Sequence, residues 1–170
     1  MSENREKTRV AVYTGSFDPI TLGHLNVIQR ACQLVDRLVV GIGVNADKSS
    51  LFNPDERVSL VRRVTADLGN VDVHVFEGLA VRFVREIGAR VMIRGIRPLT
   101  DLAGEITMLM ANRQLDEDIE TIFLMADSKL AHVSSSLIKQ ITPLADDEML
   151  AKFLPRDIVP DVRQRVEGAR

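Results

Sequence analysis

The sequence predicts a doubly wound, Rossmann-like α/β fold: helices cover both faces of a five-stranded parallel sheet, and a short helical tail follows at the C-terminus. Two observations carry this prediction. Short apolar runs rich in β-branched residues alternate along the chain with segments that have helical spacing. These helical segments are long enough to serve as crossovers, which is how neighbouring parallel strands are connected.

The expected strands share a high content of valine, isoleucine and leucine. The run Leu38–Val44 is almost wholly apolar, as expected of a strand that is covered on both faces. The run Arg9–Tyr13 is followed by the turn-forming Thr14-Gly15-Ser16. The other expected strands are Val71–Phe76, Arg90–Ile93 and Glu120–Met125.

Helices are expected between these strands. Gly23–Leu34 carries apolar residues at three- and four-residue spacing. Asn53-Pro54-Asp55-Glu56 has the Asn cap and early Pro of a helix start, and that helix is expected to end near Gly69. Further helices are expected over Leu79–Ile87, from a Thr100 cap to about Leu115, and in a tail after Ser134 that Pro143, Pro155 and Pro160 divide.

Length and composition predict one soluble domain. The chain has 170 residues, of which 45% are hydrophobic and 27% are charged, and this composition excludes a disordered, collagen-like or coiled-coil protein. We therefore expect residues 1–170 to form a single domain, with residues 1–8 as a flexible tail.

Charge and cysteine content restrict the partners. Lys and Arg total 22 against 24 Asp and Glu, so no broad basic face is expected for nucleic acid or a membrane surface, although a local anion pocket is compatible. The single cysteine, Cys32, cannot form an internal disulfide and is expected in the core. No segment has the roughly 20 apolar residues that cross a bilayer, and the first residues do not resemble a signal peptide. A cytoplasmic location is expected.

The first candidate cluster directly follows the first expected strand, where ligands bind in folds of this class. It reads Gly15-Ser16-Phe17-Asp18-Pro19-Ile20-Thr21-Leu22-Gly23-His24. Gly15 and Ser16 offer backbone N–H groups and a hydroxyl to a phosphate, and Gly23 allows a ligand close to a helix start. His24 would donate a hydrogen bond to that anion from the first helical turn; the alternative is a purely structural cap.

The second cluster, Asn45-Ala46-Asp47-Lys48, follows the second expected strand. Lys48 is either an anion ligand or an ordinary solvated charge. Two nearby matches to nucleotide-binding motifs are weaker evidence for a site than this cluster. Residues 41–46 fit the dinucleotide-binding string G-x-G-x-x-G/A, but the glycines fall inside the strand, and residues 43–49 resemble a P-loop that lacks its second glycine.

Two further clusters follow the fourth and fifth strands. In Arg94-Gly95-Ile96-Arg97, two guanidinium groups can hold a polyphosphate from two sides. Glu105, on the next helix, would orient an Arg, accept from a ribose hydroxyl, or lie on a solvated face. Ser134-Ser135-Ser136 opens a helix with Lys139 one turn later, and three hydroxyls beside helix N–H groups predict a phosphate nest.

Together these clusters resemble the nucleotidylyltransferase superfamily, whose signatures are a T/H-x-G-H motif and a later I-S-S-S/T-x-x-K/R motif. Here they read Thr21-Leu22-Gly23-His24 and Val133-Ser134-Ser135-Ser136-Leu137-Ile138-Lys139. More narrowly, the chain resembles the phosphopantetheine adenylyltransferase family from about Val10 to Leu154. The segments Phe52–Val58, Ile93–Arg97, Asn112-Arg113 and Phe123-Leu124-Met125 add to this resemblance.

The resemblance implies that ATP and 4'-phosphopantetheine are converted to dephospho-coenzyme A and pyrophosphate, the penultimate step of coenzyme A synthesis. Mg²⁺ would be carried with ATP, the protein itself would supply no metal ligands, and no covalent protein intermediate would form. A homohexamer is also implied. Met108 and Met110 suit a packing or subunit-contact surface on their helix.

The resemblance further implies roles for individual residues. His24 and Lys48 would be catalytic and would stabilise charge at the α-phosphate. The acceptor would be bound by Ser16, Lys48, Ala80 and Arg94. ATP would be bound by Ser16, Phe17, His24, Gly95, Ile96, Arg97, Glu105, Leu130, Ala131, His132, Val133, Ser134, Ser135 and Ser136.

Three positions depart from the family's usual pattern. Thr14 replaces a proline, and Gly104 and Leu130 stand where aromatic residues usually help to line the nucleotide site. Each lost aromatic surface is expected to weaken ATP binding by about 1 kcal/mol.

Three alternatives stay open at this point. Another nucleotidylyltransferase, acting on nicotinamide mononucleotide or a phosphorylated alcohol, would differ only in the acceptor pocket around Ser16, Ala80 and Arg94. A non-catalytic nucleotide-binding regulatory module would bind ATP without needing His24. A redox Rossmann protein is disfavoured by the position of the glycines within the second strand.

Overall fold

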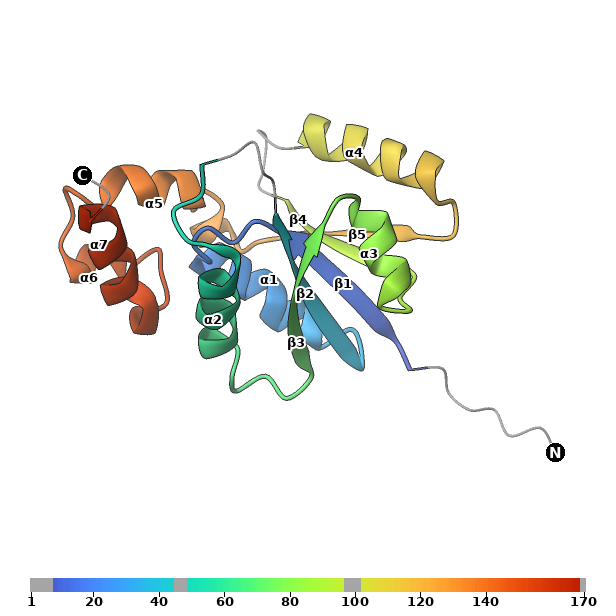
Figure 1. The fold of residues 1–170 in the computed structure, drawn as a ribbon, viewed down its shortest axis with the longest axis horizontal. Coiled ribbons are helices and arrows are strands. Elements are labelled where there is room, and N and C mark those ends of the chain that lie inside the picture. Colours follow the sequence, from blue (N-terminus) through green and yellow to red (C-terminus); the bar gives the residue numbers. More distant parts are fainter. Residues whose placement is uncertain (1–7, 45–48, 97–101, 169–170) are drawn as a thin grey trace.

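The computed structural model describes residues 8–44, 49–96 and 102–168, and it confirms the predicted α/β architecture (Figure 1). The parallel strands lie in the order β3–β2–β1–β4–β5, so β1 is at the centre of the sheet. Their bounds are Val10–Gly15 for β1, Arg37–Val44 for β2, Val71–Glu77 for β3, Val91–Ile96 for β4 and Glu120–Met125 for β5.

Strand β4 extends further than its apolar run predicted, because its pairing with β5 continues past Ile93 as far as Ile96. Arg94 lies opposite Phe123 and Gly95 opposite Leu124 in this ladder. Arg94 is therefore held at the carboxyl end of a strand rather than in a loop. This edge of the sheet is where ligands bind in doubly wound folds.

Helices cover both faces of the sheet, as predicted (Figure 1). Helices α1 and α2 and the C-terminal tail bury their apolar side chains with Ala11 and Tyr13 of β1, whereas α3 packs on the opposite face with Val12. The alternation follows from the two-residue period of a strand. The bounds are Leu22–Cys32 for α1, Pro54–Val64 for α2, Ala80–Glu86 for α3, Leu102–Leu115 for α4, Ser135–Ile141 for α5, Asp147–Leu150 for α6 and Val159–Gly168 for α7.

The local signals at helix ends were mostly right. Asn53 caps α2 by accepting from Glu56 N–H at 2.9 Å, and Pro54 is the first helical residue. The helix ends at Val64, before the expected Gly69, because a turn closes there with Leu68 N–H donating to the Thr65 carbonyl at 2.9 Å. The predicted Thr100 cap lies outside the described residues.

The expectation that Pro160 separates two tail helices is wrong. Pro160 occupies the first turn of α7, where a proline is tolerated because its missing N–H would have no helical partner. The tail is anchored to the rest of the domain near α1, since Leu22 N–H donates to the Phe153 carbonyl at 2.9 Å. Cys32 packs against the main core as expected. Within the described ranges, no helix has the length and apolar character needed to span a membrane.

Candidate active site

A polar cleft of about 280 Å³ lies at the carboxyl ends of β1 and β4. Its walls come from the loop after β1, the start of α1, the end of β4, the first turns of α4 and the segment that leads into α5. Most of the predicted site residues meet here although they are far apart in sequence. Those that line the cleft are Ser16, His24, Arg94, Gly95, Ile96, Glu105, Leu130, Val133, Ser134, Ser135 and Ser136.

Four predicted residues are described but do not line this cleft. Phe17 is only 1% exposed, and its ring meets the rings of Tyr13 and His24 edge-on, so any contact of Phe17 with a ligand must come from its backbone. Ala80 packs beside the second core cluster at the start of α3. Ala131 and His132 belong to the turn before α5 but are not among the lining residues. Lys48 and Arg97 lie outside the described residues.

Phe17 also adopts a backbone conformation that favours glycine, with a φ of 47°. A non-glycine residue in this left-handed region costs about 1–3 kcal/mol and persists only where its surroundings hold it. The buried aromatic contacts of Phe17 supply that restraint. They fix the path of the chain between Ser16 and Asp18, and so they fix one wall of the cleft.

His24 serves both as the structural cap and as a lining residue, so the two interpretations of this histidine are compatible. It is the third residue of α1, and its Nδ1 accepts from Thr21 N–H at 3.1 Å in a capping box with Thr21. In a neutral ring whose Nδ1 accepts, the proton is on Nε2. The cap therefore fixes the tautomer in which Nε2 donates.

Arg94 is held rigidly by two partners. Its Nε and one terminal nitrogen donate to both carboxylate oxygens of Glu105 at 2.8 and 2.7 Å, and the other terminal nitrogen donates to the Thr14 carbonyl at 2.8 Å. The Glu105 carboxylate raises the pKa of Arg94. Of the three roles left open for Glu105, the geometry selects the one in which it orients an arginine. The Thr14 hydroxyl, at the position where a proline is usual, accepts from Arg94 at 3.2 Å.

The three-serine nest is only partly available to a ligand. Ser134 Oγ caps α5 by accepting from Leu137 N–H at 3.1 Å, and Ser135 Oγ donates to the Pro19 carbonyl at 2.8 Å. The Ser135 proton is thus used within the chain, whereas Ser134 Oγ only accepts here and keeps its own O–H to donate to a phosphate, so the nest of three hydroxyls stays a prediction. The hydrogen bond of Ser135 attaches the start of α5 to the loop after β1.

Asp18 is a structural residue that the sequence did not reveal. Its buried carboxylate accepts from Leu51 N–H and Phe52 N–H, both at 2.8 Å, and forms an ion pair with Lys139 at 2.6 Å. Lys139 therefore points to Asp18 rather than standing in the phosphate nest. The carboxylate joins the loop after β1, the segment before α2, and α5.

Arg57 is a second residue that sequence reasoning missed. It lies on α2, is 2% exposed, and donates to the Ser16 carbonyl at 3.0 Å and the Gly43 carbonyl at 3.4 Å. In the sequence it is one of several arginines in a helix, and no local pattern distinguishes a buried one from the solvated ones.

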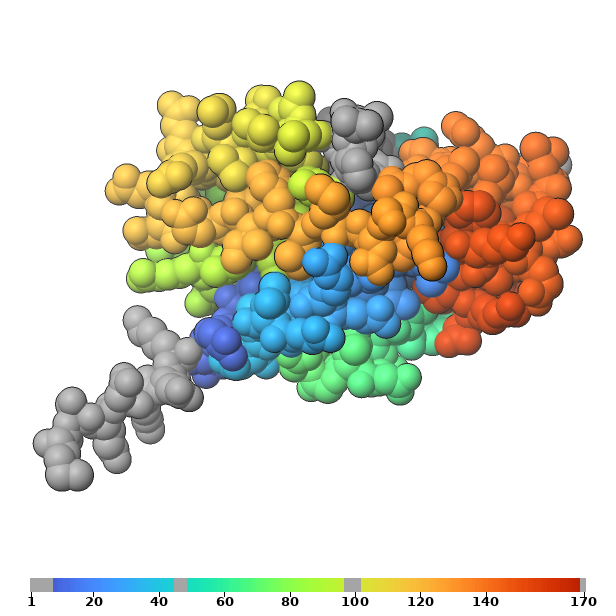
Figure 2. Space-filling model, turned by 180° about the vertical axis from the view of Figure 1, so that it is seen from behind, coloured from blue at the N-terminus to red at the C-terminus, as the bar shows by residue number. Residues whose placement is uncertain are grey.

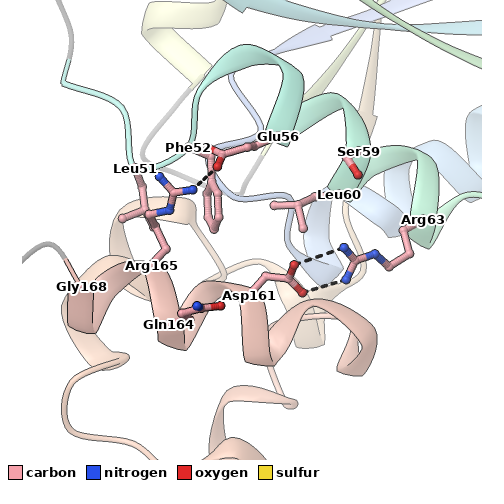
Figure 3. A pocket seen from close by; sticks show the side chains of 10 residues that line it. All are labelled: Leu51, Phe52, Glu56, Ser59, Leu60, Arg63, Asp161, Gln164, Arg165 and Gly168. Carbon is pink, nitrogen blue, oxygen red and sulfur yellow. Dashed lines mark hydrogen bonds and ion pairs between the residues drawn. The ribbon is translucent and has the colours of Figure 1, made fainter.

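A larger groove of about 760 Å³ separates α2 from α7, but its charges already satisfy one another (Figure 3). Arg63 donates to both carboxylate oxygens of Asp161 at 2.7 and 3.1 Å, and Arg165 pairs with Glu56 and lies over the Phe52 ring. These pairs attach the C-terminal helix to α2. The smaller cleft, with its donors at the sheet edge, is the better candidate for a ligand site.

The fold and the cleft define a nucleotidyltransferase. Residues 12–141 match the model of the cytidylyltransferase-like family. A solved structure of Plasmodium falciparum nicotinic acid mononucleotide adenylyltransferase, complexed with NaAD, has a TM-score of 0.60 over 96% of both chains. At 14% identity this likeness establishes the shared fold alone.

Closer relatives specify the family. The chain is 66% identical over 158 residues to phosphopantetheine adenylyltransferase of Rhodopirellula baltica. The aligned region covers 92% of this chain and 88% of that protein. It is 41% identical to the protein of the same name from Clostridium beijerinckii, over 93% of this chain and 98% of that protein. The chain therefore belongs to the phosphopantetheine adenylyltransferase family, which confirms the resemblance that its motifs indicated.

Proposed function

We propose that this protein transfers the adenylyl group of ATP to 4'-phosphopantetheine and releases dephospho-coenzyme A and pyrophosphate. The observation that carries the proposal is the meeting of His24, the fixed Arg94 and the start of α5 in one cleft at the sheet edge. The 66% identity to a phosphopantetheine adenylyltransferase supports this acceptor over nicotinamide mononucleotide.

In the proposed reaction the acceptor phosphate attacks the α-phosphate of ATP in line, and pyrophosphate leaves. The protein contributes by placing the reactants and by donating hydrogen bonds where negative charge grows. The Nε2–H of His24, whose orientation the Thr21 cap fixes, would donate to an α-phosphate oxygen. Lys48 would add a positively charged donor there. No side chain needs to act as a covalent nucleophile.

The two substrates would share the cleft. The acceptor would be bound by Arg94, Ser16 and Lys48, and outside the cleft by Ala80. ATP would be bound by Gly95, Ile96 and Arg97 with the loop 130–136. Glu105 would act by holding Arg94, as its bidentate ion pair indicates. Gly104 has no side chain, so it adds no aromatic surface. No other atom lies within 4 Å of the place where its Cβ would be.

We propose that Mg²⁺ enters with ATP. In the described part of the chain, no group of three or more His, Cys, Asp or Glu side chains is placed to hold a metal ion. The nearby carboxylates of Glu105 and Asp18 are engaged by Arg94 and Lys139. A Mg²⁺ ion bound mainly through the phosphate oxygens is consistent with this arrangement, since Mg²⁺ commonly binds in that way.

We also propose a homohexamer that works in the cytoplasm, where ATP and the acceptor are available. Helix α4 and strand β5 lie along one edge of the molecule (Figure 2). Both carry large apolar side chains that are exposed in the single chain, including Met108 at 54% and Met110 at 66%. Exposed apolar surface of this kind is typical of protein–protein contacts.

The test is pyrophosphate release from ATP and Mg²⁺, measured with 4'-phosphopantetheine, with nicotinamide mononucleotide and without acceptor. Pyrophosphate release only with phosphopantetheine supports the proposal. Release only with nicotinamide mononucleotide would show that the protein adenylates that acceptor instead. His24→Ala separates an enzyme from a binding module: we expect ATP to bind the variant normally while turnover falls by about 10²-fold or more. Unchanged turnover would contradict the assignment of His24.

A further inference from the structure

The guanidinium of Arg57 lies directly behind one wall of the candidate active site. Ser16 lines the cleft, and Arg57 holds the Ser16 carbonyl at 3.0 Å from the protein side. The same nitrogen reaches the Gly43 carbonyl at 3.4 Å near the end of β2. Arg57 therefore connects the carboxyl ends of two neighbouring strands just where the loop after β1 begins.

The charge of Arg57 has no counterion in the described part of the chain. Among the described residues, its guanidinium donates to the backbone carbonyls of Ser16 and Gly43, and its buried Nε has no hydrogen-bond partner. An arginine remains charged even when buried, and a buried charge without a partner is costly. On the same helix, by contrast, Arg63 is paired with Asp161 in a bidentate ion pair.

Two described acidic residues that are close in sequence to Arg57 or to its partner Ser16 are engaged by other groups. Asp18 is engaged by Lys139 and two backbone N–H groups, and Glu56 pairs with Arg165. A buried unpaired polar group in a native protein calls for an explanation, and a ligand is one of the few available. The ligand of the proposed function carries several negative charges in a triphosphate.

We propose that Arg57 is a positioning residue with an electrostatic role: it holds the Ser16 backbone at the wall of the cleft, and its charge, which no described residue pairs, makes the site favour nucleotides with more phosphates. This inference rests on the proposed function for the identity of the nucleotide. Because Arg57 is buried behind the cleft wall, salt screens its charge less than it screens a surface charge. The negative charge of the ligand supplies the counterion that no described residue provides.

The first test compares the dissociation constants of AMP and ATP by calorimetry, with EDTA present, for the wild type and Arg57→Met. Arg57→Met should weaken ATP binding by about tenfold more than AMP binding, the size expected for loss of one charged interaction. Arg62→Met is the matched control, because Arg62 lies on the same helix, is exposed and also donates to a backbone carbonyl, that of Val73 at 3.0 Å. An unchanged ratio of the two constants in Arg57→Met would overturn the electrostatic role.

The second test uses Arg57→Lys, which keeps the charge but cannot reproduce the planar guanidinium contacts, and it decides the matter if Arg57→Met does not fold. The ATP-to-AMP affinity ratio should stay within about threefold of the wild type, while kcat falls by about tenfold because Ser16 is no longer held. A changed ratio would refute the electrostatic role, and an unchanged kcat would refute the positioning role. The affinity ratio requires no acceptor, so it is independent of whether phosphopantetheine is the substrate.

Discussion

Replacing Asp18 by alanine should destabilise the domain strongly, although Asp18 is not a predicted ligand of either substrate. Its side chain is 7% exposed and receives two backbone N–H groups and the ammonium group of Lys139. Alanine would leave the N–H groups of Leu51 and Phe52 without their acceptor. It would also release the loop after β1 from α5.

The size of the loss follows from these contacts. Each hydrogen bond to a charged, buried acceptor contributes about 1.5 kcal/mol or more, so the two N–H groups account for about 3 kcal/mol. The ion pair adds about 1 kcal/mol or less, because the 36% exposed Lys139 side chain can regain water. The free energy of unfolding should thus fall by about 3–4 kcal/mol, a large part of the usual 5–15 kcal/mol.

The assay is urea denaturation followed by far-UV circular dichroism. Lys139→Met should lose less than Asp18→Ala, about 1–3 kcal/mol, because the buried Asp18 carboxylate loses its counterion but keeps both N–H donors. Asp36→Ala is a surface control: Asp36 also accepts from a backbone N–H and pairs with an arginine, Arg9, but it is exposed, so a much smaller loss is expected. A loss below about 1 kcal/mol for Asp18→Ala, or a larger loss for Lys139→Met, would refute this account of the Asp18 contacts.

Three further predictions test the site and the core. Arg94→Ala should weaken acceptor binding by about 1–3 kcal/mol in calorimetry, and an unchanged affinity would rule out its role as an acceptor ligand. Gly41→Ala should lower the free energy of unfolding by about 1–3 kcal/mol in thermal melts, because the new Cβ would lie 2.5 Å from the Phe83 ring. Gly69→Ala is the control, because its new Cβ would have no atom within 4 Å. Burial raises the pKa of the Cys32 thiol, so less thiolate is present at a given alkaline pH. Iodoacetamide should therefore alkylate Cys32 more slowly in the native protein than in urea, and equal rates would contradict this expectation.

The elements of the fold could be predicted because their signals are local. A strand such as β2 is recognised by a continuous apolar run, and the start of α2 by Asn53 and Glu56, which are three residues apart and bind each other. Arg94 and the loop after β1 could be predicted as parts of the site because both lie at the carboxyl end of an expected strand. The sequence patterns did not give the order of the strands, because β1 pairs with β4 across a long stretch of chain.

The roles of individual side chains depended on contacts between distant parts of the chain. Glu105 had three open interpretations until its ion pair with Arg94 selected one. The three serines at the start of α5 predict a phosphate nest, but the structure shows that Ser134 also caps the helix and that the Ser135 hydroxyl donates to the Pro19 carbonyl. A sequence motif specifies which groups are present and does not specify which neighbours compete for their hydrogen bonds.

Local patterns in this chain were sufficient to establish the class of fold, the motifs and the family, because periodicity, caps and motif spacing act over a few residues. Only the folded chain decided that Lys139 pairs with Asp18, 121 positions away, and that Arg57 is buried behind Ser16. Burial and ion pairing depend on which strands and helices meet. The energetic character of the site is therefore a property of the packing rather than of any one segment.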